Sequence, residues 1–253
     1  MDLTAAGSYD VVITNTSGFG ATSSPAILIV GADHFLAHRW SFNSDTLTND
    51  TVGGSTGTNM GTANVSGGTL NLDGSAGCFM ELPHDLIHKS NYTAVTFEFW
   101  ATYGTSGNND RVFDFGNTNF VNVTVPPPEN YVYFSPHAGV NHVLGFSPTT
   151  SESQISATGS NNLDGAINMY VACVVDPPNN IMSIYTNGVF ETSAPISASL
   201  SSVIDDKCWI GRSLFVADSY LVANIDEFRI YSGALSPASI AQSFTQGPNT
   251  RGF

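Results

Sequence analysis

The sequence predicts an all-β protein, a two-sheet antiparallel jelly-roll sandwich that ends in one short helix. Twelve short apolar runs recur along the chain, separated by turns rich in Gly, Asn, Ser and Pro, a spacing typical of sandwiches and jelly rolls. No segment before the last keeps a helical period. Only 11% of the 253 residues are charged, and the polarity comes from small residues that favour turns and strands over helix.

The first 30 residues predict a single β-hairpin, in which the runs YDVVITN (9–15) and ATSSPAILIV (21–30) flank the turn SGFG. The segment resembles the last two strands of an immunoglobulin-like domain, because Gly7 and Tyr9 match the G-x-Y of its tyrosine corner. Two strands cannot form a sandwich by themselves. We therefore expect residues 1–30 to be a fragment of an upstream domain, with residues 31–35 as a linker.

The jelly roll is expected over residues 36–244. Its predicted strands, in chain order, are LAHRWSFN (36–43), TLNLDG (69–74), CFMELP (78–83), AVTFEFWATYG (94–104), DRVFDFG (110–116), FVNVTV (120–125), NYVYFSP (130–136), HVLGFSP (142–148), MYVACVVD (169–176), NIMSIYTNGV (180–189), CWIGRS (208–213) and NIDEFRIY (224–231). One short helix is expected within LSPASIAQSF (235–244), with Ser236 as N-cap and Pro237 as its first residue. Residues 245–253 are expected to be a frayed tail.

Five motifs carry a resemblance to a known family. They are HRWSFN, TLNLDGSAGCFMELP, VTFEFWAT, VACVVDPPNNIMSIYTNG and IGRSLFVADSYLVANIDEFRIYSGALSPASI. Their order resembles the laminin-G-like, concanavalin A-like jelly-roll domain of bacterial extracellular proteins. Three positions depart from the family pattern: Phe79 replaces a tyrosine, Cys78 an aspartate and Asn168 a tryptophan. The resemblance implies an extracellular or cell-surface location, as part of a longer exported protein.

Charge excludes some partners. The chain has 7 Lys and Arg against 21 Asp and Glu, a formal charge of −14. Such a surface repels nucleic acid, whose binding depends on dense cationic contacts, and it also repels anionic lipid. Because no apolar run approaches the roughly 20 residues of a membrane span, no membrane partner is expected.

Three cysteines are an odd number for a disulfide framework. Cys173 lies in the apolar run MYVACVV and is expected in the core. Cys78 and Cys208 could pair if the fold brings their strands together, and sequence alone leaves this open.

An enzymatic alternative depends on paired carboxylates. Glycosidases need two acids about 5–9 Å apart, which E-x-D or E-x-E on a strand would supply. The chain has no two acids at this spacing. Asp226 and Glu227 are adjacent and are expected on opposite faces of their strand. If the protein is an enzyme, Glu98 with Asp114 or Glu227 is the candidate set.

The resemblance also implies one structural calcium ion. Jelly-roll binding domains of this kind often carry an acidic ligand on the last strand, which makes Asp226 the first candidate. Asp73 and Asp50, both in Gly- and Asn-rich turns, are further candidates. Calcium takes six to eight oxygen ligands, many from backbone and water, so spacing adds little evidence.

The candidate ligand-binding residues combine aromatic and polar side chains, because sugar rings stack on aromatic faces while polar groups fix their hydroxyls. In VTFEFWAT, Phe97 and Phe99 share the face expected in the core, and Glu98 and Trp100 share the other. The candidates are Trp100, Tyr131, Tyr133, Arg212, Asp218 and Tyr220, with Tyr185, Trp209 and Phe215 as further aromatics. Arg111 and Asp114 are equally consistent with a structural ion pair.

The leading interpretation is a noncatalytic carbohydrate-binding or adhesion module of a larger exported bacterial protein, monomeric and with a polysaccharide or glycan as partner. Two alternatives stay open: a polysaccharide-degrading hydrolase or lyase with acids from separate strands, and a structural or protein-binding spacer. Concanavalin-like sandwiches carry all three functions.

Overall fold

The computed structural model describes residues 7–9, 11–23, 26–28, 34–44, 48–88, 92–118, 128–149 and 153–250. The chain divides into two units, Met1–Asp33 and His34–Phe253. The predicted strand at 120–125 lies outside the described residues.

The first unit contains two antiparallel strand pairs. β1 (Gly7–Tyr9) pairs with β4 (Ala26–Leu28), and β2 (Val12–Thr14) pairs with β3 (Gly20–Thr22). The Asn15 side chain accepts hydrogen bonds from the backbone N–H groups of Ser17 and Phe19 and so closes the turn. Many β domains contain such a hairpin, so the immunoglobulin-like resemblance of this unit stays a prediction.

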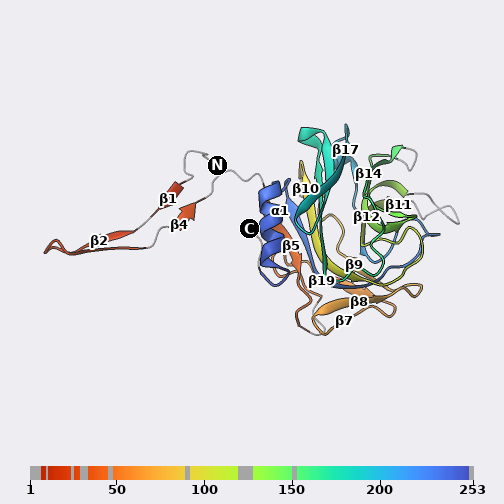
Figure 1. Ribbon diagram of the computed structural model, residues 1–253, viewed down its shortest axis with the longest axis horizontal. Coiled ribbons are helices and arrows are strands. Elements are labelled where there is room, and N and C mark those ends of the chain that lie inside the picture. The colour runs from red at the N-terminus through yellow and green to blue at the C-terminus, as the bar shows by residue number, and fades with distance from the viewer. Residues whose placement is uncertain are drawn as a thin grey trace. The chain divides into compact units, whose positions relative to one another are not determined.

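The second unit is a sandwich of two large antiparallel sheets (Figure 1). The eight-stranded sheet has the order β17-β16-β15-β10-β19-β8-β7, with β5 paired to β19. Its strands are β5 (Phe35–Trp40), β7 (Asn64–Ser66), β8 (Thr69–Asp73), β10 (Val95–Tyr103), β15 (Met169–Asp176), β16 (Ile181–Thr186), β17 (Val189–Pro195) and β19 (Val222–Ser232).

The seven-stranded sheet has the order β14-β13-β12-β11-β18-β9-β6. Its strands are β6 (Thr58–Met60), β9 (Phe79–Leu82), β11 (Phe113–Thr118), β12 (Pro128–Ala138), β13 (Asn141–Ser147), β14 (Ile155–Thr158) and β18 (Lys207–Ile210). In the described part of the chain, the short 3-10 helices Pro177–Asn179 and Leu200–Ser202 lie in connections. The predicted all-β jelly roll is confirmed.

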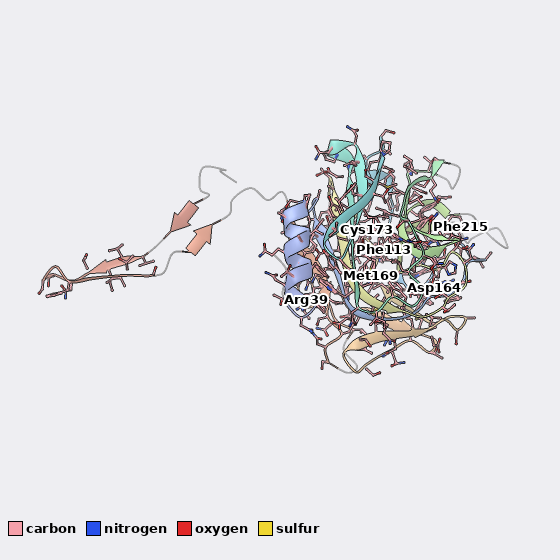
Figure 2. The ribbon with its side chains drawn as sticks, viewed as in Figure 1. Arg39, Phe113, Asp164, Met169, Cys173 and Phe215 are labelled. Carbon is pink, nitrogen blue, oxygen red and sulfur yellow. The ribbon has the colours of Figure 1, made fainter. Side chains whose placement is uncertain are left out.

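The main core lies between the two sheets and is rich in phenylalanine. Phe97 and Phe99 point inward from β10, as predicted, and meet Phe113 of β11 and Phe228 of β19. The rings of Phe97 and Phe113 stack with centroids 4.2 Å apart. Figure 2 shows Phe113 and Cys173 in this interior.

The predicted C-terminal helix forms as α1 (Pro237–Gln246) and covers the outer face of the eight-stranded sheet (Figure 1). The Ser236 hydroxyl caps it by accepting from the Ser239 N–H at 3.1 Å, and Pro237 is its first residue. A second apolar cluster, including Trp100, Tyr170 and Ile240, fills the space beneath it. The residues after the helix are held rather than frayed as far as Thr250, because Arg229 donates to the carbonyls of Pro248 and Thr250.

All three cysteines are buried free thiols. Cys173 lies in the main core, as expected, and Cys78 and Cys208 are not joined by a disulfide. Within the described residues, no helix is both long and apolar enough to cross a membrane.

Candidate functional site

Glu98, the first candidate catalytic acid, is enclosed beneath α1. Its side chain is 0% exposed. The Tyr170 hydroxyl donates to one carboxylate oxygen at 2.5 Å, and the Ser243 hydroxyl of α1 donates to the other at 3.0 Å. Burial raises the pKa of Glu98, although these hydrogen bonds and the Arg229 charge oppose the rise. Within the described structure, this carboxylate therefore does not face solvent.

Glu227, the second candidate, belongs to the same buried network. Arg39 forms a bidentate pair with it at 2.8 and 2.7 Å, and Arg229 contacts it from the other side. The Arg229 guanidinium also lies 3.5 Å from the Glu98 carboxylate. Arg39 (Figure 2) donates to the carbonyl of Pro248, just after the C-terminal end of α1. Both acids therefore have arginine partners and serve to attach the helix and the chain end to the sheet.

A β-bulge changes the expected orientation of Asp226. Opposite β10, Trp100 pairs with Glu227 while Ala101 pairs with Ile225, which leaves Asp226 as an extra residue. Ile225 and Phe228 both face the main core, so the two acids between them both lie outside it. The expectation that strand alternation places Asp226 and Glu227 on opposite faces is wrong, because the bulge resets the alternation.

The three candidate calcium ligands lie in different surroundings. Asp50 is buried, and its carboxylate accepts from His38 and from the N–H groups of Arg39, Val52, Gly53 and Ser55. Burial opposes its ionisation, but these hydrogen bonds outweigh burial and lower the pKa of Asp50.

Asp73 is exposed and lies opposite Val222 of β19. Val222 is four residues from Asp226, about 13 Å along a strand, so Asp73 and Asp226 do not share one ion. Among the described residues, no three His, Cys, Asp or Glu side chains are spaced to hold a metal. The calcium ion stays a prediction, with Asp226 as its first ligand.

Five of the six candidate ligand-binding residues share one region, the outer face of the seven-stranded sheet. Tyr131 and Tyr133 point outward from β12, and residues 211–221, which we call the covering loop, fold across them with Arg212, Asp218 and Tyr220. Phe215, labelled in Figure 2, belongs to this loop. Its ring meets that of Tyr131 with centroids 5.5 Å apart. The sixth residue, Trp100, lies on the other sheet, 5% exposed and packed against Tyr170 beneath α1.

The covering loop is held by a buried polar network. The Arg111 guanidinium lies 3.8 Å from the Tyr133 ring centroid and pairs with Asp218 at 3.1 Å. Asp114, the third candidate catalytic acid, accepts from the Leu214 N–H at 2.9 Å. Burial raises the pKa of Asp114 to about 7, although Arg111 opposes the rise. Arg111 and Asp114 thus position the loop, as the structural ion pair of the sequence prediction.

Beside the covering loop the same sheet face is open. A groove of about 340 Å³, here called the outer groove, is lined by Met60, Phe79, Glu81, Lys207, Trp209 and Arg212. The Arg212 guanidinium lies over Trp209, 4.0 Å from its ring centroid, and 4.8 Å from that of Phe79. The Trp209 indole N–H donates to Glu81 at 3.3 Å. Trp209 and Phe79 thus lie at the base of the groove, 3% and 5% exposed beneath the Arg212 guanidinium, with Lys207 and Glu81 as charged groups at its sides.

Sequence reasoning missed four of the groove residues: Met60, Phe79, Glu81 and Lys207. Strand alternation in FMEL and KCWI does place Phe79 with Glu81, and Lys207 with Trp209. That these two pairs face one groove follows from the pairing of β18 with β9, where Trp209 lies opposite Glu81. No local sequence pattern predicts this register between β18 and β9.

A second opening of about 410 Å³ lies at another edge of the sandwich, lined in part by His142, Asn161, Asn162, Phe190 and Glu191. Phe190 is 52% exposed. The His142 ring bonds to Glu191 at 3.1 Å and to the Asn161 carbonyl. His142, Asn161 and Glu191 are thereby bonded to one another, and this opening supplies a comparison for the outer groove.

Comparison with solved structures finds the same fold in proteins of low identity. Domain 4 of AbnA, a GH43 extracellular arabinanase from Geobacillus stearothermophilus, in complex with arabinotriose, is 20% identical, with a TM-score of 0.65 over 83% of this chain and 98% of that one. The Ruminococcus gnavus IT-sialidase CBM40 bound to alpha2,3 sialyllactose is 12% identical, with a TM-score of 0.54 over 69% and 95%.

The botulinum neurotoxin serotype C1 binding domain is 14% identical, with a TM-score of 0.56 over 81% of this chain and 53% of that one. No curated protein sequence matches the chain. The model of the laminin G family Laminin_G_3 matches residues 73–241. This match extends over most of the second unit, and the chain belongs to the concanavalin A-like lectin/glucanases superfamily.

Proposed function

We propose that the protein is a noncatalytic carbohydrate-binding module and that the outer groove is its binding site. The observation that carries the proposal is the arrangement of Trp209, Phe79 and Arg212 in an open groove with Glu81 and Lys207 at its sides. Carbohydrate sites combine apolar contact surface with a few polar groups that fix orientation, and this groove has both.

Two similar structures support the proposal, because one is described in complex with arabinotriose and the other bound to sialyllactose. The noncatalytic part is supported by the burial of Glu98 beneath α1 and by the pairing of buried Glu227 with Arg39 and Arg229. We infer that the module acts as a monomer within a longer exported protein. If calcium binds through Asp226, its site lies on the eight-stranded sheet, whereas the outer groove lies on the seven-stranded sheet.

The test is retention of the full chain on polysaccharide affinity gels and a glycan array, with millimolar calcium and with a chelator. Retention is expected, and Trp209→Ala should weaken it at least tenfold, equivalent to about 1.4 kcal/mol. Phe190→Ala, in the second opening, is the matched aromatic control and should bind as the native protein does. Circular dichroism checks that both variants fold, and Glu81→Gln gives a milder change in the groove.

Absence of retention on the whole panel would reject the proposal, as would equal loss in Trp209→Ala and Phe190→Ala. Release of reducing sugar by the purified chain, abolished in Glu98→Gln, would establish the hydrolase alternative instead.

A further inference from the structure

The distribution of cationic side chains points to the chemistry of the ligand. The chain has only 7 Lys and Arg, and five of them lie among the described residues. Three of these five side chains form ion pairs with acids of the same chain. Arg39 pairs with Glu227, Arg111 with Asp218, and Arg229 with Glu98 and Glu227.

The remaining two, Lys207 and Arg212, both line the outer groove. Each is partly exposed, and in the described part of the chain neither forms an ion pair. Within the described part of a chain whose formal charge is −14, the two cationic side chains without an ion pair thus lie in one groove. A site for neutral sugar needs no such pair, because hydroxyls are satisfied by uncharged or acidic partners.

Arg212 is also held in a suitable geometry. Its guanidinium stacks 4.0 Å from the Trp209 ring centroid, so the ring occupies one face and leaves the edge N–H groups for a ligand. A guanidinium edge matches the two oxygens of a carboxylate or sulfate. Lys207, two residues before Trp209 on β18, adds a compact positive charge. Glu81, oriented by the Trp209 indole, remains as an acceptor for sugar hydroxyls.

We infer that the outer groove takes carbohydrate that carries isolated acid groups, carboxylate or sulfate, within a largely neutral chain. This inference rests on the proposed function. Arg212 and Lys207 pair with the acid group, and Phe79 and Met60 contact the apolar face of the sugar. Densely charged polyanions are disfavoured, because the 21 acids of the chain repel them beyond the groove.

Matched pairs of glycans test the inference. Acidic oligosaccharides with one carboxylate, with one sulfate, or with every residue charged are arrayed beside their neutral forms, made by esterification, carboxyl reduction or desulfation. Isothermal titration then measures the best binders at 0.15 M salt. We expect the best ligands to carry one or few acid groups and to lose at least tenfold in affinity when neutralised. The carboxylate and sulfate arms show which acid is preferred.

The variants Arg212→Gln and Lys207→Gln should each weaken binding of the acidic ligand about tenfold and bring it near that of the neutral form. Glu81→Gln should preserve the preference for acid, and Phe190→Ala is the control outside the groove. Best binding to neutral glycans, or an acid preference that survives both cationic replacements, overturns the inference while the proposed function stands. Absence of binding to any glycan rejects the proposed function itself.

Discussion

At the scale of single residues, the acids divide into those that hold the fold and those that face solvent. Glu98 and Glu227 were candidates for catalysis because acids from separate strands can meet in a folded sandwich. In the folded protein they are paired, with Arg39 and Arg229. A buried pair is costly to break, since removing one partner leaves an uncompensated charge in a medium of low dielectric.

Arg229→Ala should therefore lower the free energy of unfolding by about 3–5 kcal/mol, since it leaves Glu98 and Glu227 without a shared cation. Urea unfolding at pH 7, followed by tryptophan fluorescence, measures the loss. Arg212→Ala is the control, because its guanidinium has no buried carboxylate partner in the described residues, and it should cost less than 1 kcal/mol. Equal losses in the two variants would show that the network contributes nothing specific.

At the scale of elements, the C-terminal helix depends on local sequence, whereas the β-bulge in β19 depends on long-range strand pairing. The bounds of the helix are determined by nearby residues, because Ser236 and Pro237 begin it and Gly247 ends it. The bulge at Asp226 is not, since it depends on the pairing of β19 with β10. It leaves Phe228 facing the core and turns Glu227 toward Arg39.

Ser236→Ala should destabilise the protein by about 1 kcal/mol, because the first turn of α1 loses the acceptor for the Ser239 N–H. Ser236→Asp, which keeps an acceptor at the N-cap, is the matched control and should stay near the native value. Thermal unfolding by calorimetry separates them. A Ser236→Ala protein as stable as the Ser236→Asp protein would mean that packing of Ile240, not the cap, fixes the helix start.

At the scale of the whole molecule, burial of several acids governs the response to pH. Burial raises the pKa of Asp110 and of Asp114 to about 7, from 3.8. A raised pKa means that the folded state binds the proton more tightly than the unfolded state. The contribution of these groups to stability is thus full below about pH 4 and is lost as the pH rises toward 7.

Asp73 acts in the opposite sense. Hydrogen bonds, the largest from the Ser75 N–H, lower its pKa to about 2, so its contribution is lost as the pH falls from about 4 to 2. We expect the free energy of unfolding to peak near pH 4–5 and to decline toward pH 7. Urea unfolding from pH 3 to 8 measures this curve.

The double variant Asp110→Asn, Asp114→Asn should flatten the decline between pH 4 and 7. The single variant Asp206→Asn, at an exposed position, is the control and should keep the native curve. A native curve that instead rises from pH 4 to 7 would contradict the expected role of the two buried acids.

The sequence by itself determined the fold class, the C-terminal helix and the core phenylalanines. These follow from turn residues, a capping serine and strand alternation, all of which act over a few neighbouring residues. Strand alternation in NYVYFSP likewise puts Tyr131 and Tyr133 on one face and Val132 and Phe134 on the other, and the two clusters agree with this. These local rules hold wherever the strand is regular.

Only the tertiary structure decided which acids meet arginines, where the bulge falls and which side chains share a groove. Trp209 and Glu81 are 128 residues apart in sequence, and they meet because β18 pairs with β9. Trp100 was expected at a ligand and lies beneath α1, because the helix packs on its face of the sheet. Long-range pairing of strands has no local signature, and so the outer groove emerges from the fold rather than from any motif.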